Sequence, residues 1–320
     1  MNSFSQQDVQ FSQNQFTKQF YNPAYVAIGS TLCGTLIGRQ QWAGFSGAPQ
    51  TGLLSVKSPL SVIKSGIPGS AGLNVLSDAL GNERTLGVNL ALGYALNPGA
   101  VGPGTLAFGL SAGIINKRFI NNWVSVDDKF VDPSIPNDAA SSTKFDLNLG
   151  IYYDHNDFFV GISVAHLIPA TLSDQGSTQV AATPPAQGTV NQQWSLNYGL
   201  KQHMYLMAGY NYTLTGNPDF QLRPMILAKT EGSSTQFDLN CNVYYKQQIW
   251  GGLSYRLSDA VVVTAGYEFQ PLGLRVGYAY DITTSELRRN SGGSHEIALN
   301  YCIKIPKKII RHIYKNVRYL

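Results

Sequence analysis

Charged side chains are scarce in this chain. They make up 13% of its 320 residues, whereas an average soluble domain has roughly 25%. The 23 Lys and Arg residues barely outnumber the 19 Asp and Glu residues, so the formal net charge is only +4. A hydrophobic fraction of 43% excludes an intrinsically disordered chain. The composition disfavours a cytosolic enzyme and points to a membrane environment.

Long apolar runs are also missing, although a membrane-spanning helix needs about 20 consecutive apolar residues. The closest candidates are residues 19–38 and 85–116, which contain no charged residue. The first stretch is interrupted by Asn22 and Pro23, and the second is rich in Gly. The sequence therefore predicts no spanning helix. Its first residues show neither a basic n-region nor an apolar h-region, so no secretory signal is visible in them.

Cysteine and histidine are too few to build a site. Cys33, Cys241 and Cys302 are scattered along the chain, so we expect all three to be packing residues rather than parts of a disulfide framework or a zinc site. The five His residues lie in separate segments and form no metal-binding pattern. We therefore expect no metal, no cofactor and no catalytic centre.

The chain does contain a regular alternation of apolar residues with small or polar ones. Side chains of a strand point to opposite faces in turn, so a period of two predicts strands rather than helices. The alternation is clearest over residues 88–96, 145–153, 237–245, 261–269, 272–280 and 297–303. Turn signals such as Asn97-Pro98-Gly99 separate these segments.

These segments predict an all-β fold, a transmembrane antiparallel β-barrel. They cover about 9 to 15 residues each, which is enough for a tilted strand to cross a bilayer. A spanning sheet must also close, because lipid cannot satisfy open backbone edges. We count about fifteen candidate strands and discard residues 71–80, a short segment that is the weakest of them, because bacterial barrels have an even number of strands. The prediction is a closed, monomeric barrel of about 14 strands; the alternative is a soluble β-sandwich or a propeller, but a propeller repeat near 40 residues is not found.

Two stretches are too long for tight turns and are predicted to be loops, residues 119–142 and residues 168–190. With a barrel strand beginning near residue 190, the strand count places the 168–190 loop and the 285–293 loop on opposite sides of the membrane, and one miscounted strand would reverse this placement. Aromatic residues near segment ends suit the interfacial girdles of a barrel. They are Tyr94, Trp123, Tyr153, Tyr198, Trp250, Tyr255 and Tyr301.

Three parts of the chain are distinguished by pattern. Residues 1–26 lack clean alternation and are predicted to be a periplasmic or plug segment, and residues 27–305 form the barrel. Residues 306–320 belong to a basic tail without any acid, in which apolar residues recur at near-helical spacing behind Pro306. The tail is either solvated or in contact with anionic lipid, an envelope polymer or an acidic partner.

Catalytic motifs do not fit this pattern. Gly-Leu-Ser-Ala-Gly at residues 109–113 has the spacing of a hydrolase nucleophile elbow, but that elbow needs a strand, a turn and a helix around Ser111, and the alternation here continues as a strand. His295 and Glu296 are neighbours in a strand and must face opposite sides. Ionisable residues of both signs share the lumen parity and indicate a solvated or salt-bridged interior. They are Asp146, Lys201, Arg223, Lys229, Asp238, Arg256, Glu268, Arg275, Asp281 and Glu296.

Two sets of short motifs lie near the two ends of the chain. The first is Gln6-Gln7-Asp8, Phe11-Ser12-Gln13, Tyr21-Asn22-Pro23-Ala24-Tyr25, Arg39-Gln40-Gln41-Trp42 and Gly47-Ala48-Pro49 with Thr51. The second is Gly251 to Arg256, Gly277-Tyr278-Ala279-Tyr280-Asp281, Thr283 to Leu287 and Gly292-Gly293-Ser294-His295-Glu296-Ile297. In order and spacing these motifs resemble the PorP/SprF family of type IX secretion system outer-membrane proteins.

The resemblance implies a non-catalytic β-barrel in the outer membrane of Bacteroidota. Members of the family support the export and cell-surface anchoring of a cognate secreted protein, often an adhesin with a type B C-terminal sorting domain, in gliding motility or adhesion. The implied partners are this cargo, periplasmic or outer-membrane components of the machinery, and outer-membrane lipid, with no nucleic acid. The alternatives are a structural component linking the outer membrane to periplasmic parts, and a diffusion channel for small solutes.

The motif residues are our candidates for partner-binding or scaffold positions. They are Asn22, Pro23, Arg39, Gln41, Trp42, Pro49, Gly292, Gly293, Ser294, His295 and Glu296. Around Arg39 and Trp42 we expect a cation–π contact or an interfacial anchor. The two glycines are expected to allow a tight return into the last strand.

Overall fold

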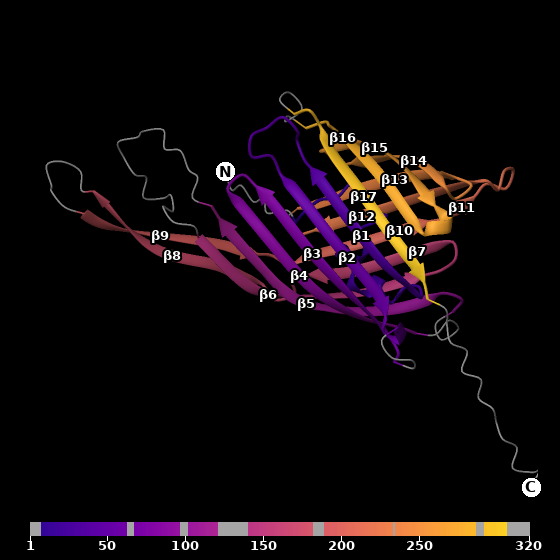
Figure 1. The fold of residues 1–320 in the computed structure, drawn as a ribbon, viewed down its shortest axis with the longest axis horizontal. Coiled ribbons are helices and arrows are strands. Elements are labelled where there is room, and N and C mark those ends of the chain that lie inside the picture. The colour runs from indigo at the N-terminus through magenta and orange to yellow at the C-terminus, as the bar shows by residue number, and fades with distance from the viewer. Residues whose placement is uncertain are drawn as a thin grey trace, which may run out of the picture.

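A computed structural model shows a closed antiparallel barrel (Figure 1). It describes residues 8–62, 67–96, 102–120, 140–181, 189–232, 234–285 and 291–305. The wall strands are β1 (Thr31–Gln40), β2 (Gln50–Pro59), β3 (Ser70–Leu80), β4 (Glu83–Ala95), β5 (Thr105–Phe119), β6 (Ala140–Asp154), β7 (Phe158–Ala165), β10 (His203–Tyr210), β12 (Phe220–Thr230), β13 (Thr235–Tyr245), β14 (Ile249–Arg256), β15 (Ala260–Phe269), β16 (Leu274–Thr283) and β17 (Ser294–Lys304).

The remaining elements are not wall strands. They are α1 (Lys18–Tyr21), η1 (Pro23–Ala27), η2 (Leu60–Val62), β8 (Ala170–Ala181), β9 (Thr189–Leu200), the short β11 (Tyr212–Thr213) and η3 (Gln270–Leu272). No helix among the described residues is both long and apolar enough to cross a membrane.

Two pairings close the barrel. Sequence neighbours pair in antiparallel ladders along most of the wall, β1 pairs with β17, and β10 pairs directly with β12. The ring therefore contains fourteen strands, which confirms the predicted number. Its membership differs from the prediction, because β3 is a full member of the ring, paired with both β2 and β4.

Glycine explains why residues 71–80 look weak as a strand. A Cβ atom on Gly72 of β3 would lie 2.6 Å from Cγ1 of Val26, which is inside the barrel. The missing side chain thus makes room for the chain that fills the lumen. Discarding this segment was wrong, because the glycine reflects packing against the interior rather than the end of a strand.

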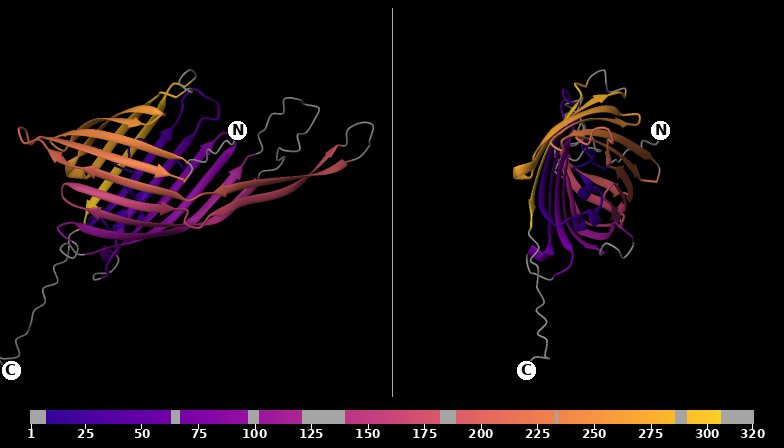
Figure 2. Two further views of the ribbon diagram at one scale, coloured as in Figure 1. Left: turned by 180° about the vertical axis from the view of Figure 1, so that it is seen from behind. Right: turned by 90° about the vertical axis from the view of Figure 1, so that its right-hand side faces the viewer.

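The segment predicted as a loop over residues 168–190 contains a strand. β8 pairs with β9 from Ala170↔Leu200 to Ala181↔Thr189. Figures 1 and 2 show this β8–β9 hairpin running well beyond the ends of the other strands. We call that end of the barrel the hairpin end and the opposite end, where β17 finishes at Lys304, the C-terminal end.

The hairpin also changes which connections share an end of the barrel. Because β8 and β9 both lie outside the ring, the chain leaves β7 and enters β10 at the hairpin end. The β16–β17 connection lies at that same end, so the prediction that it and residues 168–190 are on opposite sides is wrong. The miscount came from taking the strand at residue 190 as part of the wall.

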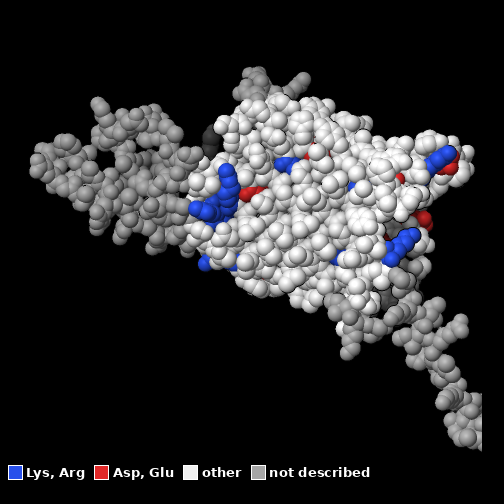
Figure 3. All heavy atoms as spheres, in the orientation of Figure 1, with Lys and Arg blue, Asp and Glu red and all other residues white. Residues whose placement is uncertain are grey.

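Side-chain alternation sorts the wall into a polar interior and an apolar exterior. Leu90, Leu92 and Leu253 are at least 60% exposed on the outer face, which is where lipid lies. Figure 3 shows that most of the barrel surface seen from this side carries no charged side chain. Inward positions include Asp146, Asp238, Asp281 and Glu296, all buried, as the lumen parity predicted.

Residues 8–28 lie inside the barrel and are called the plug segment. Helix η1 of this segment packs against the inner faces of β3, β4, β5 and β6. Helix α1 packs against η1. Aromatic side chains fill the space around it: the Phe11 ring lies 5.5 Å from that of Phe20, and the Tyr21 ring lies 5.0 Å from that of Tyr205 on β10. The barrel core is therefore built between the wall and the chain's own N-terminal part.

Candidate functional site

A single carboxylate of the wall holds the turn at the start of the plug segment. The backbone N–H of Ser12 donates to Oε2 of Glu296 at 2.7 Å, and the N–H of Gln13 donates to Oε1 at 2.9 Å. Glu296 lies on β17 and is completely buried. Both oxygens of the carboxylate therefore bind consecutive amides, which fixes the backbone of the plug segment as well as its side chains.

Two arginines of the wall donate to the same part of the plug segment. Arg39 of β1 donates from Nη2 to Oδ2 of Asp281 at 2.8 Å and from Nη1 to Oγ of Ser12 at 2.6 Å. Arg256 of β14 donates from Nη2 to the backbone oxygen of Phe11 at 3.0 Å. We call Arg39, Arg256, Asp281 and Glu296 the clamp, because each contacts the plug segment from a different strand.

The hydroxyl of Ser12 is the centre of the clamp. Its Oγ lies 2.7 and 2.8 Å from the two carboxylate oxygens of Asp281, to which it donates, and it accepts from Arg39. Removing buried ions from water is expensive unless each one is paired and hydrogen-bonded. Here the pairs are completed by groups of the plug segment, so the clamp and the plug segment stabilise each other.

The ionic network continues around the inner wall. Arg256 Nε lies 3.2 Å from Oδ1 of Asp238, and Lys229 Nζ lies 3.7 Å from Oδ2 of the same residue. All three side chains are buried. Charges of both signs thus alternate across β12, β13, β14 and β16, and the interior near the hairpin end is salt-bridged rather than freely solvated.

Asn22 attaches the second half of the plug segment to the opposite wall. Its Nδ2 donates to the backbone oxygens of Ile151 and Ile162 at 2.9 and 3.2 Å, and its Oδ1 accepts from the N–H of Ala24 at 2.9 Å. The last bond caps helix η1, which begins at Pro23. Asn22 therefore joins the start of a helix to strands β6 and β7.

The wall facing η1 has glycine where the backbone of the plug segment comes close. Gly93, Gly109 and Gly150 are direct neighbours across β4, β5 and β6. A Cβ atom on Gly109 would lie 2.2 Å from the backbone nitrogen of Ala24. Only glycine leaves room for this approach.

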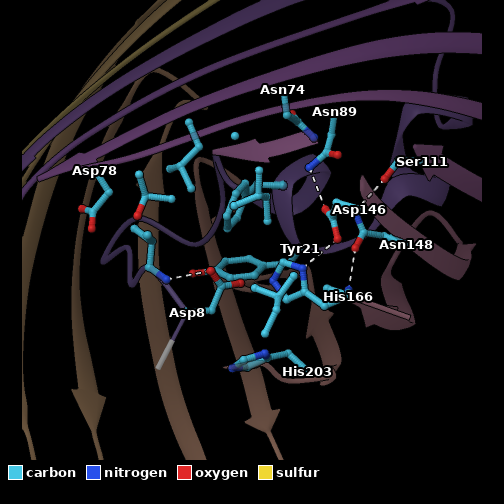
Figure 4. Close-up of a pocket in the computed structure, with 18 of the residues that line it drawn as sticks. Asp8, Tyr21, Asn74, Asp78, Asn89, Ser111, Asp146, Asn148, His166 and His203 are labelled. Carbon is cyan, nitrogen blue, oxygen red and sulfur yellow. Dashed lines mark hydrogen bonds and ion pairs between the residues drawn. The ribbon is translucent and has the colours of Figure 1, made fainter. Parts of the chain in front are cut away.

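The hairpin-end cavity has a volume of about 240 Å³ and lies between the plug segment and the wall. Figure 4 shows its polar side chains. Asp146 Oδ1 lies 2.7 Å from Nδ1 of His166, and its Oδ2 accepts from Asn89 and Asn148. Burial lowers the pKa of His166, but the hydrogen bond to Asp146 and the nearby carboxylates of Asp8 and Asp146 outweigh burial and raise it.

Ser111 lies in this cavity but in a straight strand. β5 continues from Thr105 to Phe119 without a turn at the serine, which confirms that the GxSxG pattern is no nucleophile elbow. Ser111 Oγ accepts from Nδ2 of Asn148 at 2.9 Å (Figure 4). The residue acts as a polar link in the hydrogen-bond network of the cavity wall.

A second cavity, of about 570 Å³, lies at the C-terminal end. Gln19 of the plug segment lines both cavities and therefore lies at the partition between them. Its Nε2 donates to the backbone oxygens of Val56 and Leu73 at 3.0 and 3.2 Å. The plug segment thus runs from Asp8 in one cavity to Ile28 in the other and divides the lumen.

Cys33 and Cys302 form a disulfide beside the second cavity. They are direct partners in the β1–β17 ladder, and the bond links the first and last wall strands across a sequence separation of 269 residues. The expectation that all three cysteines are only packing residues is wrong for this pair, because scattered positions in sequence meet where the barrel closes. Cys241 is free and exposed.

The predicted site residues separate into an interior group and a rim group. Asn22, Pro23, Arg39 and Glu296 lie inside and hold the plug segment, as described above. The rim group ties the β1–β2 and β16–β17 connections together at the hairpin end: Gly292 N–H donates to the oxygen of Ala43 at 2.7 Å, and the N–H of Ala43 donates to Gly293.

Further bonds complete this rim. Trp42 donates its N–H to Oγ of the buried Ser294 at 3.1 Å, and Gln41 donates its N–H to the oxygen of Pro49 at 2.9 Å. Gly293 has a φ angle of 88°, in the left-handed region that favours glycine, immediately before the last strand begins. The rim residues therefore shape the loops, and their backbones make most of the contacts.

Two predicted side-chain placements are corrected. Arg39 points into the lumen and binds carboxylates, so the cation–π contact with Trp42 is not formed. Trp250 is 1% exposed and stacks on Tyr244 at 5.5 Å inside the barrel, so it is not an interfacial girdle residue. Trp123, the side chain of Tyr198 and the basic tail over residues 306–320 lie outside the described residues.

His295 faces away from the interior. Its Nδ1 lies 2.7 Å from the hydroxyl of Tyr278, whereas Glu296 is buried in the clamp. This confirms that the two neighbours face opposite sides. Ser12, Asp281 and Arg256 were not selected from the sequence as site residues, although the motifs and the lumen parity contain them; what the sequence lacked was the pairing that brings them together.

The fold and the filled lumen define an outer-membrane β-barrel with an internal plug. Solved structures with similar folds include the CymD monoaromatic hydrocarbon channel, with a TM-score of 0.55, 12% identity and coverage of 91% of this chain and 93% of that chain. The Ralstonia pickettii toluene transporter TbuX has a TM-score of 0.52 and 9% identity, covering 91% of this chain and 94% of that one. At these identities the likeness concerns the fold.

The family model of the type IX secretion system membrane protein PorP/SprF matches residues 3–301. The chain belongs to the PorP/SprF family, as its motifs indicated, and its place is the outer membrane. No curated protein matches the chain. Membership in a secretion-system family of membrane barrels suggests a non-enzymatic role and implies interaction with the secretion machinery and its cargo.

Proposed function

We propose that this barrel supports the export and cell-surface anchoring of one cognate secreted protein, an adhesin with a type B C-terminal sorting domain, for gliding or adhesion. Membership in the PorP/SprF family supports a role in the type IX secretion system. The filled lumen is the observation that carries the rest of the proposal, because a barrel with a plugged interior is better suited to hold a partner at its mouth than to conduct solutes.

The clamp makes the plug a built part of the protein. Glu296 is completely buried and accepts two backbone N–H groups, and Arg39 and Arg256 donate to the same turn. A plug segment that left the lumen during transport would have to separate these buried charges, which is energetically costly. We propose the division that the sequence pattern predicts: residues 1–26, which contain most of the plug segment, residues 27–305 as the barrel, and residues 306–320 as a basic tail for contact with anionic lipid or an envelope partner.

The two ends of the barrel are assigned from the lengths of their connections. Outer-membrane barrels have short periplasmic turns and longer extracellular loops. The hairpin end carries the β5–β6 connection, residues 120–139, and the β7–β10 connection with the β8–β9 hairpin, and both are longer than any connection at the C-terminal end, such as residues 60–69 or 246–248. We therefore place the hairpin end at the cell surface, with the rim group of Gln41, Trp42, Pro49, Gly292, Gly293 and Ser294 as its partner-binding or scaffold positions.

Deletion of the gene tests the proposal. We expect one adhesin to disappear from the cell surface, measured by quantitative proteomics of surface-shaved cells, while other type IX cargo stays at its normal level. Complementation with the intact gene is the control. Loss of all cargo would instead make the barrel a structural component of the machinery, and an unchanged surface proteome would contradict the proposal.

Conductance distinguishes an anchor from a diffusion channel. The purified barrel in a planar bilayer should show no steady open steps, because the plug segment separates the two cavities of the lumen. An open porin in the same bilayer is the positive control. Stable conductance steps from the intact barrel would favour the channel.

A further inference from the structure

The outer edge of β9 has no strand beside it among the described residues. β8 and β9 form a separate sheet of two strands, so each pairs only with the other. β8 lies beside β6, which extends at the hairpin end. No described strand pairs with the other edge of β9, so among the described residues the backbone N–H and C=O groups along that edge have no ladder partner.

The sequence of this edge lacks the usual protection. Natural proteins protect an exposed edge strand with lysine or other charges, with proline, or by keeping the strand short. Thr189–Leu200 contains no charged residue and no proline and is 12 residues long. β8 has a single charged residue, Asp174. A long unprotected edge readily accepts another strand.

The edge leads into the barrel mouth. Gly199 and Leu200 at the end of β9, followed by Lys201, line the hairpin-end cavity. Asp78, Lys117 and the Asp146–His166 pair line the same cavity (Figure 4 labels three of these four). A strand added to β9 would thus have its end beside a polar cavity of both charge signs, which suits a peptide terminus or polar turn better than an apolar ligand.

We propose that the β9 edge is the docking site for an extended segment of the secreted partner, which adds to the β8–β9 hairpin as a third strand. This rests on the proposed function, because the partner is the cargo held at the cell surface. Main-chain hydrogen bonds along Thr189–Leu200 bind the segment, and the hairpin-end cavity receives the end of the segment nearest the barrel. The other occupant of such an edge, the hairpin of a second copy, is an outcome of the test.

Edge charges test the proposal in the full-length protein in its own membrane. The variant carries Gln193→Lys and Ser195→Lys on β9. Its matched control carries Ser177→Lys and Gln175→Lys, which are the residues directly across the ladder on β8. Both variants add the same charge to the same part of the hairpin, and neither changes a wall strand, so heat-modified gel mobility should report a folded barrel in both.

The readout is the surface amount of the protein that the gene deletion removes. We expect the β9 variant to lower it about tenfold, because lysines on an edge strand oppose the addition of another strand and about 1.4 kcal/mol of lost binding is a tenfold effect, and the β8 variant to leave it near wild type. Equal effects of both variants, or none from either, would overturn the docking edge while leaving the proposed function intact. If the deletion itself removes no surface protein, that result contradicts the proposed function and, with it, the docking edge.

A photo-crosslinking residue provides a second measurement that does not depend on loss of binding. p-Benzoylphenylalanine at Gln193 should crosslink to the cargo on intact cells, and the same residue at Ser177 should give little product. Crosslinked dimers of the barrel from Gln193 would show that a second copy occupies the edge and would overturn the proposal.

Discussion

Arg39 and Glu296 are direct partners across the ladder that closes the barrel, and both side chains point at the same turn of the plug segment. Arg39 Nη1 lies 3.3 Å from Oε2 of Glu296. The seam between the first and last strands is therefore also the place where the plug is held. Arg39 and Glu296 therefore belong both to the ladder that closes the barrel and to the contacts that hold the plug segment.

Replacing Glu296→Gln should loosen the plug segment. A glutamine oxygen accepts one of the two amide bonds from Ser12 and Gln13 and leaves Arg39 with less opposing charge. Breaking a buried ion pair in this way costs about 3 to 5 kcal/mol. We expect a lower unfolding temperature, measured by heat-modified gel mobility. We also expect faster proteolysis near residues 8–28.

Glu268→Gln is the matched control for this prediction. Glu268 Oε2 also lies close to an arginine, 3.5 Å from Nε of Arg275, but its side chain is 27% exposed. Partly exposed pairs contribute about 0 to 1 kcal/mol. Equal destabilisation by the two substitutions would contradict the special role of the clamp.

Gly109→Ala should displace helix η1 from the wall. The new Cβ would lie 2.2 Å from the nitrogen of Ala24, and forcing an extra carbon into a packed interior costs about 1 to 3 kcal/mol. We expect lower thermal stability together with new conductance steps in a planar bilayer. Gly38→Ala is the control, because nothing lies within 4 Å of its added carbon. If Gly109→Ala changed neither thermal stability nor conductance, the close packing of η1 would not be required.

Removing the seam disulfide should lower stability without changing the fold. In Cys33→Ser, Cys302→Ser or the double variant, the first and last strands are joined only by their ladder, and such a bond stabilises by about 2 to 4 kcal/mol. Wild type treated with a reductant should melt like the double variant. Cys241→Ser, at the free exposed cysteine, should melt like untreated wild type. Mass spectrometry of non-reduced peptides checks the bond itself.

His166 should make stability depend on pH. Its pKa is raised above the ordinary value, because the Asp146 hydrogen bond and the Asp8 and Asp146 charges outweigh burial. A raised pKa gives stabilisation that is complete below the ordinary histidine pKa of about 6.5 and is lost as pH rises through the folded-state pKa. His203 is a further titratable group that faces His166, with the two ring centroids 5.7 Å apart.

The measurement is the difference in unfolding temperature between wild type and His166→Gln across this pH range. The difference should be largest at acidic pH and shrink as pH rises. His155→Gln, in a turn where the imidazole lies 3.9 Å from the exposed Asp157, should keep the wild-type pH dependence. A difference that grows with rising pH would contradict the assigned ion pair.

Strand positions and inward-facing residues could be predicted because alternation is a local property. Val88 to Leu96 alternates in the sequence and in the wall, and Glu296 faces inward while His295 does not. Membership of the ring could not be predicted in the same way. β9 alternates no worse than a wall strand, and β3 is weakened by the Gly72 that the plug segment requires.

By itself, the sequence determined an all-β outer-membrane barrel of one family, because a period of two, scarce charge and ordered motifs are all written along the chain. Only the tertiary structure decided what the motifs do. The clamp residues Arg39, Asp281 and Glu296 meet around Ser12, and Cys33 meets Cys302, because closing the barrel brings its two ends together. Pairing between residues hundreds of positions apart depends on strand register, which no local pattern specifies.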